Sequence, residues 1–260
     1  MKLDIYVPSY KRKDASLIKK LILADIPFTI VLDHEQDLVD YSPLRSEKVK
    51  LMFVEKPLGI GYVRQRIKDR YNGRPIIMLD DDTQLRLRKF EDPTSLPVCK
   101  EPETIRQWFE TIDSFCANNT FDLGSAAESL AYTNTNKVLK SCNVCSVTIF
   151  NSERCKEINY DPRLYKRMED WDLILQAITR KFKFLVCNEV MRHCPMNKSA
   201  KDVGGCSEVY RDDKVMRDTT LYLRSKWGTD IVKLTQKKIG NIPDFKVDLK
   251  AFRKRHGYDY

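Results

Sequence analysis

A short apolar run that ends in three carboxylates constrains the fold of this chain most. Residues Ile76–Leu79 follow Pro75 and are continuously apolar, which predicts a buried central β-strand. Asp80, Asp81 and Asp82 come directly after it. Because side chains alternate along a strand, we expect Asp80 and Asp82 to face one side and Asp81 the other. Such a pair suits Mg²⁺ or Mn²⁺, although a solvated acidic loop has the same composition.

The first third of the chain alternates strand and helix patterns. Strands are predicted at residues 3–10, 28–33 and 50–55. Between the first two we expect a helix capped by Asp14 or Ser16, and a second helix, which starts with glycine, is predicted at 59–70. This rhythm predicts an α/β fold with a mostly parallel central sheet flanked by helices. Ligands bind beyond the carboxyl ends of such strands, so the loops at 8–12, 33–37 and 80–82 are expected to meet.

The middle of the chain is less regular. Residues 84–104 contain three prolines and many charges, which predicts a connecting loop. A helix is predicted at 103–115, a polar small-residue stretch at 122–136 and a strand near 144–150.

A second acidic cluster opens a later helix. Glu169, Asp170 and Asp172 lie in its first turn, and Trp171 begins its apolar face. Acids at this position complement the helix dipole, and N-terminal capping explains one or two of them. Three acids beside a tryptophan also have the composition of a catalytic base with its supports.

Composition limits the class of protein and its partners. The chain has 260 residues, no apolar stretch near the roughly 18 residues of a membrane span, and eight cysteines, so we expect a cytoplasmic protein with reduced thiols. Cys142 and Cys145 have CxxC spacing, but a structural zinc site would need a second such pair. The net charge is +9, and residues 231–260 hold 8 Lys/Arg against 3 Asp/Glu. A basic tail with interleaved aromatics favours a nucleic-acid partner, although it can also serve solubility.

Four motifs in order carry a family resemblance. VPSYKR, GIGYVRQR, a strand ending in DDD, and MEDWDL together resemble the GT-A glycosyltransferases, over most of residues 1–227. More narrowly, the chain resembles the phage TET-associated glycosyltransferases, which act on hydroxymethylated pyrimidines in DNA. The resemblance implies a GT-A domain at 1–227, with a nucleotide-sugar half at about 1–100 and an acceptor half at about 101–227, followed by a basic C-terminal extension at 228–260.

The resemblance also implies roles for individual residues. Asp170 would be the general base, and a divalent metal, Mn²⁺ or Mg²⁺, would be held by Asp80, Asp82 and His193. The UDP-sugar donor would be bound by Pro8, Ser9, Tyr10, Arg12, Glu35, Arg64, Asp80, Asp81 and the loop glycines Gly204 and Gly205. The basic residues Arg253, Lys254 and Arg255 would contact nucleic acid.

The implied reaction is transfer of a sugar from a UDP-sugar to a hydroxyl of modified cytosine in double-stranded phage DNA, in the host cytoplasm, with inversion. Two alternatives stay open. One is a GT-A enzyme that acts on a glycan or protein. The other is a non-catalytic nucleic-acid-binding protein on a GT-A scaffold, which would be expected to have lost its carboxylates. The sugar, the metal and the oligomeric state are not fixed by the sequence.

Overall fold

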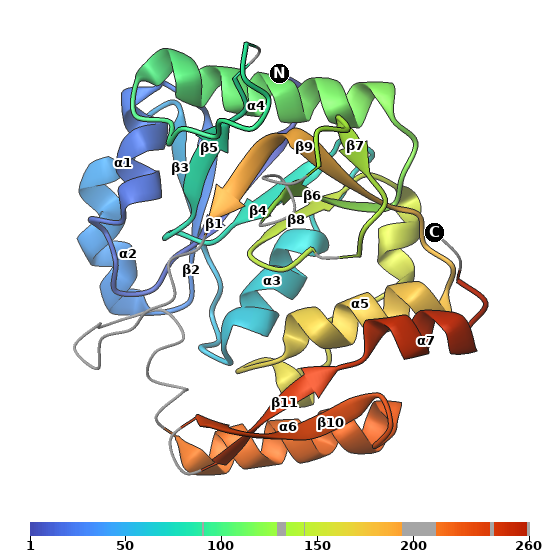
Figure 1. Ribbon diagram of the computed structural model, residues 1–260. Helices are drawn as coiled ribbons and strands as arrows, with labels where there is room; N and C mark the ends of the chain where they lie inside the picture. The colour runs from blue at the N-terminus through green and yellow to red at the C-terminus, as the bar shows by residue number, and fades with distance from the viewer. Residues whose placement is uncertain (90, 129–133, 143, 194–211, 240–241, 259–260) are drawn as a thin grey trace.

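The computed structural model describes residues 1–89, 91–128, 134–142, 144–193, 212–239 and 242–258. A central sheet carries helices on both faces, and a hairpin and two helices complete the C-terminal part (Figure 1). The strands are β1 (Asp4–Pro8), β2 (Phe28–Leu32), β3 (Val49–Phe53), β4 (Ile76–Leu79), β5 (Gln84–Leu87), β6 (Leu123–Ala127), β7 (Val138–Leu139), β8 (Val147–Phe150), β9 (Phe184–His193), β10 (Val232–Ile239) and β11 (Ile242–Val247). The α-helices are α1 (Ser16–Leu23), α2 (Glu35–Tyr41), α3 (Ile60–Lys68), α4 (Pro102–Asn118), α5 (Glu169–Thr179), α6 (Asp213–Trp227) and α7 (Leu249–Arg255), and short 3₁₀ turns include η4 (Pro162–Leu164).

The large sheet has the order β3-β2-β1-β4-β8-β6-β9-β5, with β7 paired to β9. Parallel pairing joins β3 to β2, β2 to β1 and β1 to β4. This confirms the parallel strands predicted from the first third of the chain. Antiparallel pairs begin where β8 joins β4. The carboxyl ends of β1, β2 and β4 therefore lie at one edge of the sheet.

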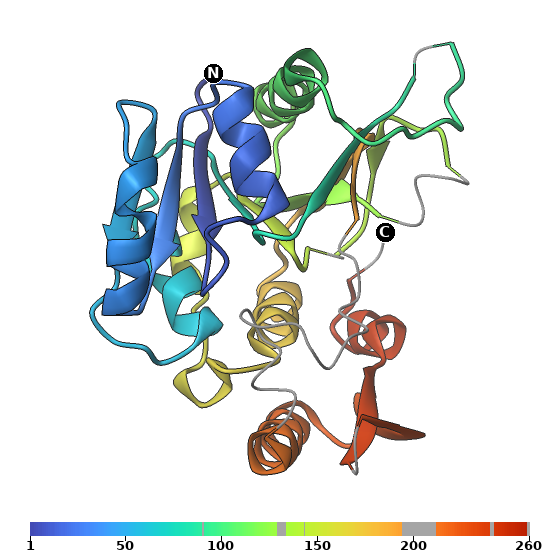
Figure 2. The ribbon, with the colours of Figure 1, turned by 90° about the vertical axis from the view of Figure 1, so that its left-hand side faces the viewer.

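Strand β4 is central and buried on both faces, as its sequence predicts. Ile76 and Met78 belong to one hydrophobic cluster, together with side chains of α3 and α5. Ile77 and Leu79 belong to the other cluster, together with side chains of α1 and α4. Figures 1 and 2 show these helices on opposite faces of the sheet. Because side chains alternate along the strand, β4 contributes to a separate hydrophobic cluster on each face of the sheet.

Several strands lie where the sequence predicts none, among them β5 and β6. Strand β5 falls within residues 84–104, which were expected to form a loop, and pairs antiparallel with β9 at the edge of the sheet. Leu85 and Leu87 alternate with Gln84, Arg86 and Arg88, which is a strand pattern, but the prolines and charges of residues 84–104 favoured a loop. Strand β6 falls within the expected polar stretch 122–136 and has the sequence LGSAA. A side chain at Gly124 would come within 2.5 Å of the Phe121 ring, so this strand needs small residues.

The expected loop at 33–37 is also partly helical, because α2 begins at Glu35. The other predicted elements agree with the structure to within a few residues, although α1 begins after Ala15, with no side-chain cap from Asp14 or Ser16.

The C-terminal residues pack on the main body. Val247 and Phe252 are buried in the same cluster as α3 and α5. The Phe252 ring lies 5.5 Å from the Trp227 ring and perpendicular to it. None of the helices in the described ranges combines the length and the apolar character that crossing a bilayer requires.

Candidate active site

The loops after β1 and β4 are joined by direct contacts. The Ser9 hydroxyl donates to Asp81 Oδ2 at 2.5 Å. Arg12 Nη1 lies 3.1 Å from Asp81 Oδ1 and 3.0 Å from Asp82 Oδ2, so one guanidinium binds both carboxylates. The predicted meeting of the strand-end loops is confirmed at these contacts.

The loop after β2 reaches the same place through ring contacts and acids. The Tyr10 and His34 rings lie 4.7 Å apart with a 36° tilt. Asp33, at the end of β2, is buried, whereas Glu35 is exposed at the start of α2. Of these two acids, Asp33 is therefore the one that is buried at the carboxyl ends of the strands.

Two residues of α2 that the sequence did not single out organise the first loop. Tyr41 is fully buried, its hydroxyl lies 2.7 Å from the Ser9 hydroxyl, and it accepts from the backbone N–H of Arg12 at 2.9 Å. Asp37 accepts from the backbone N–H of Lys11. Asp37 and Tyr41 lie three and seven positions after His34, which is the spacing of one helix face. This signal was missed because residues 33–37 were expected to form a loop.

The three aspartates leave the strand in a turn. The backbone N–H of Thr83 donates to the carbonyl of Asp80 at 3.0 Å. The expected alternation is therefore wrong for Asp81 and Asp82, which share Arg12, because the chain is no longer extended there. Asp80 and Asp82 nevertheless interact. Burial raises the pKa of Asp82, and the charge of Asp80 raises it further.

Arg64 joins β4 to α5. Its side chain is 9% exposed, with Nη2 2.6 Å from Asp80 Oδ1 and Nη1 2.7 Å from Glu169 Oε1. Burial alone would lower the pKa of this guanidinium, but Asp80 and Glu169 hold it well above its usual value. Burial raises the pKa of Glu169, and the charge of Arg64 lowers it. One cation thus balances two acids that lie 89 positions apart in the sequence, at 80 and 169.

The glycines that begin α3 make this bridge possible. Gly59 has φ +111°, a left-handed conformation that glycine adopts without strain. Gly61 donates its N–H to the carbonyl of Tyr165 at 2.8 Å. A Cβ at Gly61 would lie 2.8 Å from Tyr165 Cα, so only glycine lets α3 approach the start of α5 this closely. The GIG motif thereby places Arg64 beside Glu169.

The three acids of α5 have different surroundings. Asp172 is fully buried and accepts from Lys226 and from Trp227 Nε1 at 2.7 Å, which anchors α6 to α5. Glu169 pairs with Arg64. Asp170 is partly exposed, and its Oδ1 accepts from the N–H of Trp171. Of the three, Asp170 is the one available to a substrate.

Asp170 shares its surroundings with the β4 site. Its charge raises the pKa of Arg64, and it adds to burial in raising the pKa of the Cys145 thiol. Met168, the N-cap residue just before α5, has a left-handed backbone with φ +66°. A non-glycine residue in this conformation is strained, and such strain gathers at functional sites.

The predicted third metal ligand, His193, lies on the strand that pairs with β5, and β5 begins two positions after Asp82. His193 is exposed at the end of β9 and pairs with Gln84 of β5. Within the described ranges, the structure groups no three His, Cys, Asp or Glu side chains in a way that could hold a metal ion. Gly204 and Gly205 lie outside the described residues.

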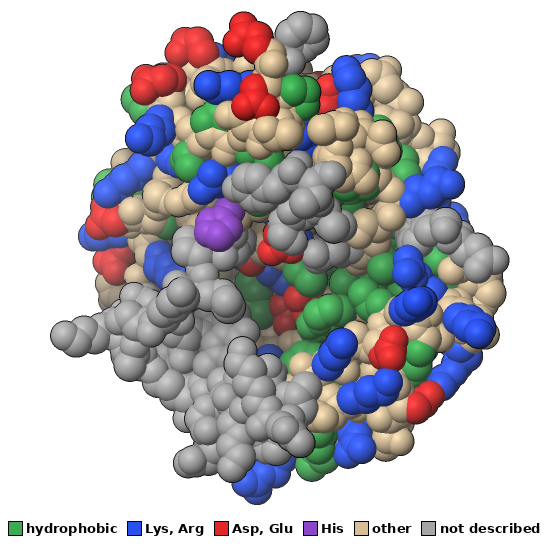
Figure 3. Space-filling model, in the orientation of Figure 1, with side chains coloured by type: hydrophobic (Ala, Val, Ile, Leu, Met, Phe, Trp, Pro, Cys, Tyr) green, Lys and Arg blue, Asp and Glu red, His purple; other side chains and the backbone are tan. Residues whose placement is uncertain are grey.

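The remaining predicted residues are spread over two regions. Pro8 is buried at the end of β1, opposite Val31 of β2. In α7, Arg255 pairs with Asp230, Lys254 is exposed, and Arg253 lines a pocket. Figure 3 shows acidic side chains at the floor of a central hollow, with Lys and Arg side chains over the C-terminal elements to its right.

A protein-family comparison identifies the chain. The model of the family described as TET-associated glycosyltransferase matches residues 3–205, which is more than half of the sequence. The chain belongs to this family. It is therefore a glycosyltransferase, and the sequence resemblance is confirmed at the level of family and enzyme class. No curated protein matches it.

Solved structures are similar to this chain in fold. The crystal structure of GalNAc-T7 with UDP, GalNAc and Mn²⁺ is 11% identical, with TM-score 0.52, and the match covers 98% of this chain and 54% of that one. S. aureus TarS 1-349 in complex with UDP is 14% identical, with TM-score 0.46, and the match covers 86% and 66%. The chain thus spans about half to two thirds of these proteins. The sheet and its helices have the GT-A glycosyltransferase fold.

Proposed function

We propose that this glycosyltransferase moves a sugar from a UDP-sugar to a hydroxyl of a modified cytosine, hydroxymethylcytosine or a derivative, in phage DNA. The main support is that the loops after β1, β2 and β4 meet around Asp80 and Asp82, and that Arg64 connects this group to α5, which carries Asp170. Residues of about 1–100 form the donor half, those of about 101–227 the acceptor half, and 228–260 a basic extension.

The donor site is built from hard oxygen ligands and cations. The side chains of Asp80 and Asp82 are each 32% exposed, so their carboxylates can reach a ligand. Mg²⁺ and Mn²⁺ are commonly held by one or two carboxylates together with substrate phosphates, and Asp80 and Asp82 can supply the carboxylates, with His193 as the proposed third ligand. The GalNAc-T7 structure contains both UDP and Mn²⁺, which supports the same donor chemistry here.

The first loop would hold the nucleoside. Ser9 and Arg12 are fixed by Asp81 and Tyr41, and Tyr10 presents a ring beside His34. An aromatic pair with nearby hydrogen-bonding groups suits a uracil base and its ribose. Asp33 and Asp37 add acceptors at the same edge.

The transfer step needs a base on the acceptor side. A hydroxyl is a weak nucleophile at neutral pH, so Asp170 takes its proton as the oxygen bonds to the anomeric carbon. The bond from that carbon to the diphosphate oxygen breaks, and the pair of electrons leaves with UDP. A metal on Asp80 and Asp82 would neutralise charge on the diphosphate. A single displacement inverts the anomeric configuration.

The acceptor assignment is supported by the family description and by charge. The family is named for an association with TET proteins. The net charge of +9 and the basic residues of the C-terminal part favour a polyphosphate partner. A base within a duplex can be reached by turning its nucleotide out of the stack.

Replacing Asp82 with alanine tests the donor site. We expect the affinity for a UDP-sugar in the presence of Mn²⁺ to fall at least about tenfold, because one of two carboxylate ligands is lost. Titration calorimetry with and without Mn²⁺ measures it. The exposed Asp218 on α6 provides the control Asp218→Ala, which should bind as the wild type does. An Asp82→Ala variant with unchanged Mn²⁺-dependent affinity contradicts the metal assignment.

A further inference from the structure

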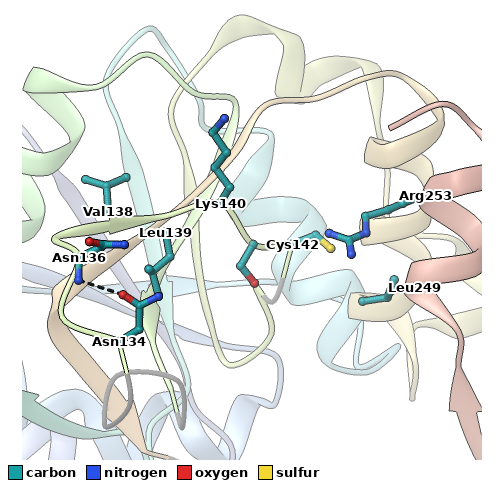
Figure 4. A pocket seen from close by; sticks show the side chains of 9 residues that line it. Asn134, Asn136, Val138, Leu139, Lys140, Cys142, Leu249 and Arg253 are labelled. Carbon is teal, nitrogen blue, oxygen red and sulfur yellow. Dashed lines mark hydrogen bonds between the residues drawn. The ribbon is translucent and has the colours of Figure 1, made fainter. Parts of the chain in front are cut away.

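A pocket of about 520 Å³ lies between the segment 134–142 and α7, apart from the β4 carboxylates. Figure 4 shows Asn134, Asn136 and Lys140 on one side and Leu249 and Arg253 on the other. Its volume falls within the usual range of small-molecule sites. No step of the proposed donor chemistry uses it.

The charged groups of the pocket are both cationic, and the other polar side chains are amides and a hydroxyl that can donate hydrogen bonds. Arg253 directs its guanidinium across the pocket toward Cys142 (Figure 4), and Lys140 supplies a second cation. The Oδ1 atom of Asn134 already accepts from the N–H of Asn136 at 2.9 Å, so its amide nitrogen is the group left to donate. None of the residues that line the pocket is an acid. This lining suits an anion.

The segment that forms the near wall is held in place. Buried Asn188 donates to the carbonyls of Asn134 and Asn136 at 2.6 and 2.8 Å. Arg88 donates to the carbonyl of Asn134 at 3.2 Å. A wall fixed by three such bonds presents its side chains in defined positions, as a binding site requires.

The pocket adjoins the proposed base. Cys142 lines it, and Cys145, three positions further along, lies near Asp170, whose charge adds to burial in raising the pKa of the Cys145 thiol. Three residues of chain span at most about 11 Å, so the pocket wall at Cys142 and the surroundings of Asp170 belong to one region. Leu249 and Arg253 lie beyond residue 205, where the family match ends. The far wall is therefore supplied by the C-terminal part of this chain.

From these observations we infer that the pocket binds a nucleotide of the acceptor strand, with Arg253 and Lys140 on its phosphate and Leu249 against its base or sugar. The inference rests on the proposed DNA acceptor and deepens it. It also distinguishes the basic residues of α7 from one another, because Arg253 lines the pocket whereas Lys250, Lys254 and Arg255 do not.

The test compares DNA binding by Arg253→Gln, Lys140→Gln and a control. Lys250→Gln removes the same charge from an exposed position of α7 that does not line the pocket. The probe is a labelled hydroxymethylcytosine duplex, and fluorescence anisotropy gives its affinity over a range of salt. We expect each pocket variant to bind about tenfold more weakly, with a salt slope lower by about one, and the control to change less than about twofold.

The outcomes separate the two proposals. Mn²⁺-dependent UDP-sugar binding by the pocket variants should equal that of the wild type, since the donor site is elsewhere. Lys140 is exposed, so its variant reports on the pocket even if Arg253→Gln folds poorly. Pocket variants that bind DNA like Lys250→Gln, or that lose UDP-sugar binding, overturn the inference alone. A wild-type protein that neither binds nor modifies this duplex overturns the DNA acceptor as well.

Discussion

Replacing Asp170 with asparagine is expected to lower kcat by about 10²- to 10⁴-fold, the usual contribution of a general base. The change keeps the shape of the side chain and its hydrogen bond from the N–H of Trp171, but removes the basic oxygen. Binding of the UDP-sugar should be unchanged, because Asp170 lies on α5 and not among the strand-end loops. Single-turnover kinetics and calorimetry measure the two effects separately.

Asp172→Asn is the matched control, with the same chemical change two positions along the helix. Asp172 is buried and holds Lys226 and Trp227, so its replacement should lower the free energy of unfolding and leave kcat of the folded protein near that of the wild type. An Asp170→Asn variant that retains full turnover places the base elsewhere. A sugar linkage that retains the donor configuration also contradicts a single displacement assisted by Asp170.

Replacing Arg64 with methionine is expected to lower the free energy of unfolding by about 3–5 kcal/mol. Arg64 is the cation between Asp80 and Glu169, and Glu169 is 5% exposed. Methionine keeps much of the volume, but it leaves the buried carboxylate without its partner. Urea unfolding measures the change.

Two further variants isolate the cause. Arg66→Met removes the same charge from an exposed position of α3, where its ion pair to Asp69 spans 3.9 Å, so it should cost under about 1 kcal/mol. Adding Glu169→Gln to Arg64→Met should recover part of the loss, because the buried group no longer needs a charge. Equal losses for Arg64→Met and Arg66→Met would show that the bridge does not stabilise the fold.

Local sequence was sufficient to predict the elements with a strong and continuous pattern. The apolar run Ile76–Leu79 needs burial on both faces, and the structure places it at the centre of the sheet. The prediction that ligand-binding loops meet follows from parallel strands sharing one edge, and the Ser9–Asp81 and Arg12–Asp82 contacts confirm the meeting.

Strands β5 and β6 were missed for different reasons. In β6, LGSAA has low strand propensity, and its glycine allows close packing beside Phe121, so tertiary packing overrides propensity. In β5, Leu85 and Leu87 alternate with polar residues, which is a strand pattern, but the prolines and charges of residues 84–104 favoured a loop.

What sequence reasoning missed acts over long separations. Tyr41, at the end of α2, was not predicted, and it contacts Ser9 and Arg12 of the first loop. Arg64 was predicted as a site residue, but its contact with Glu169, at a separation of 105 residues, was not. Such pairs cannot be read from spacing in one sequence. The alternation rule was wrong for Asp81 because it describes an extended strand, whereas the chain turns at Asp80.

Transfer of sugar to DNA tests the account most directly. Purified protein is incubated with Mn²⁺ or Mg²⁺, a panel of UDP-sugars, and duplexes that carry cytosine or hydroxymethylcytosine. The DNA is then digested to nucleosides, and their masses are measured by mass spectrometry. The account predicts a pentose or hexose increment that is confined to the modified duplex and lost when the metal is chelated. Metal-dependent UDP-sugar hydrolysis with no increment on either duplex would contradict the DNA acceptor and direct the search to glycans or proteins.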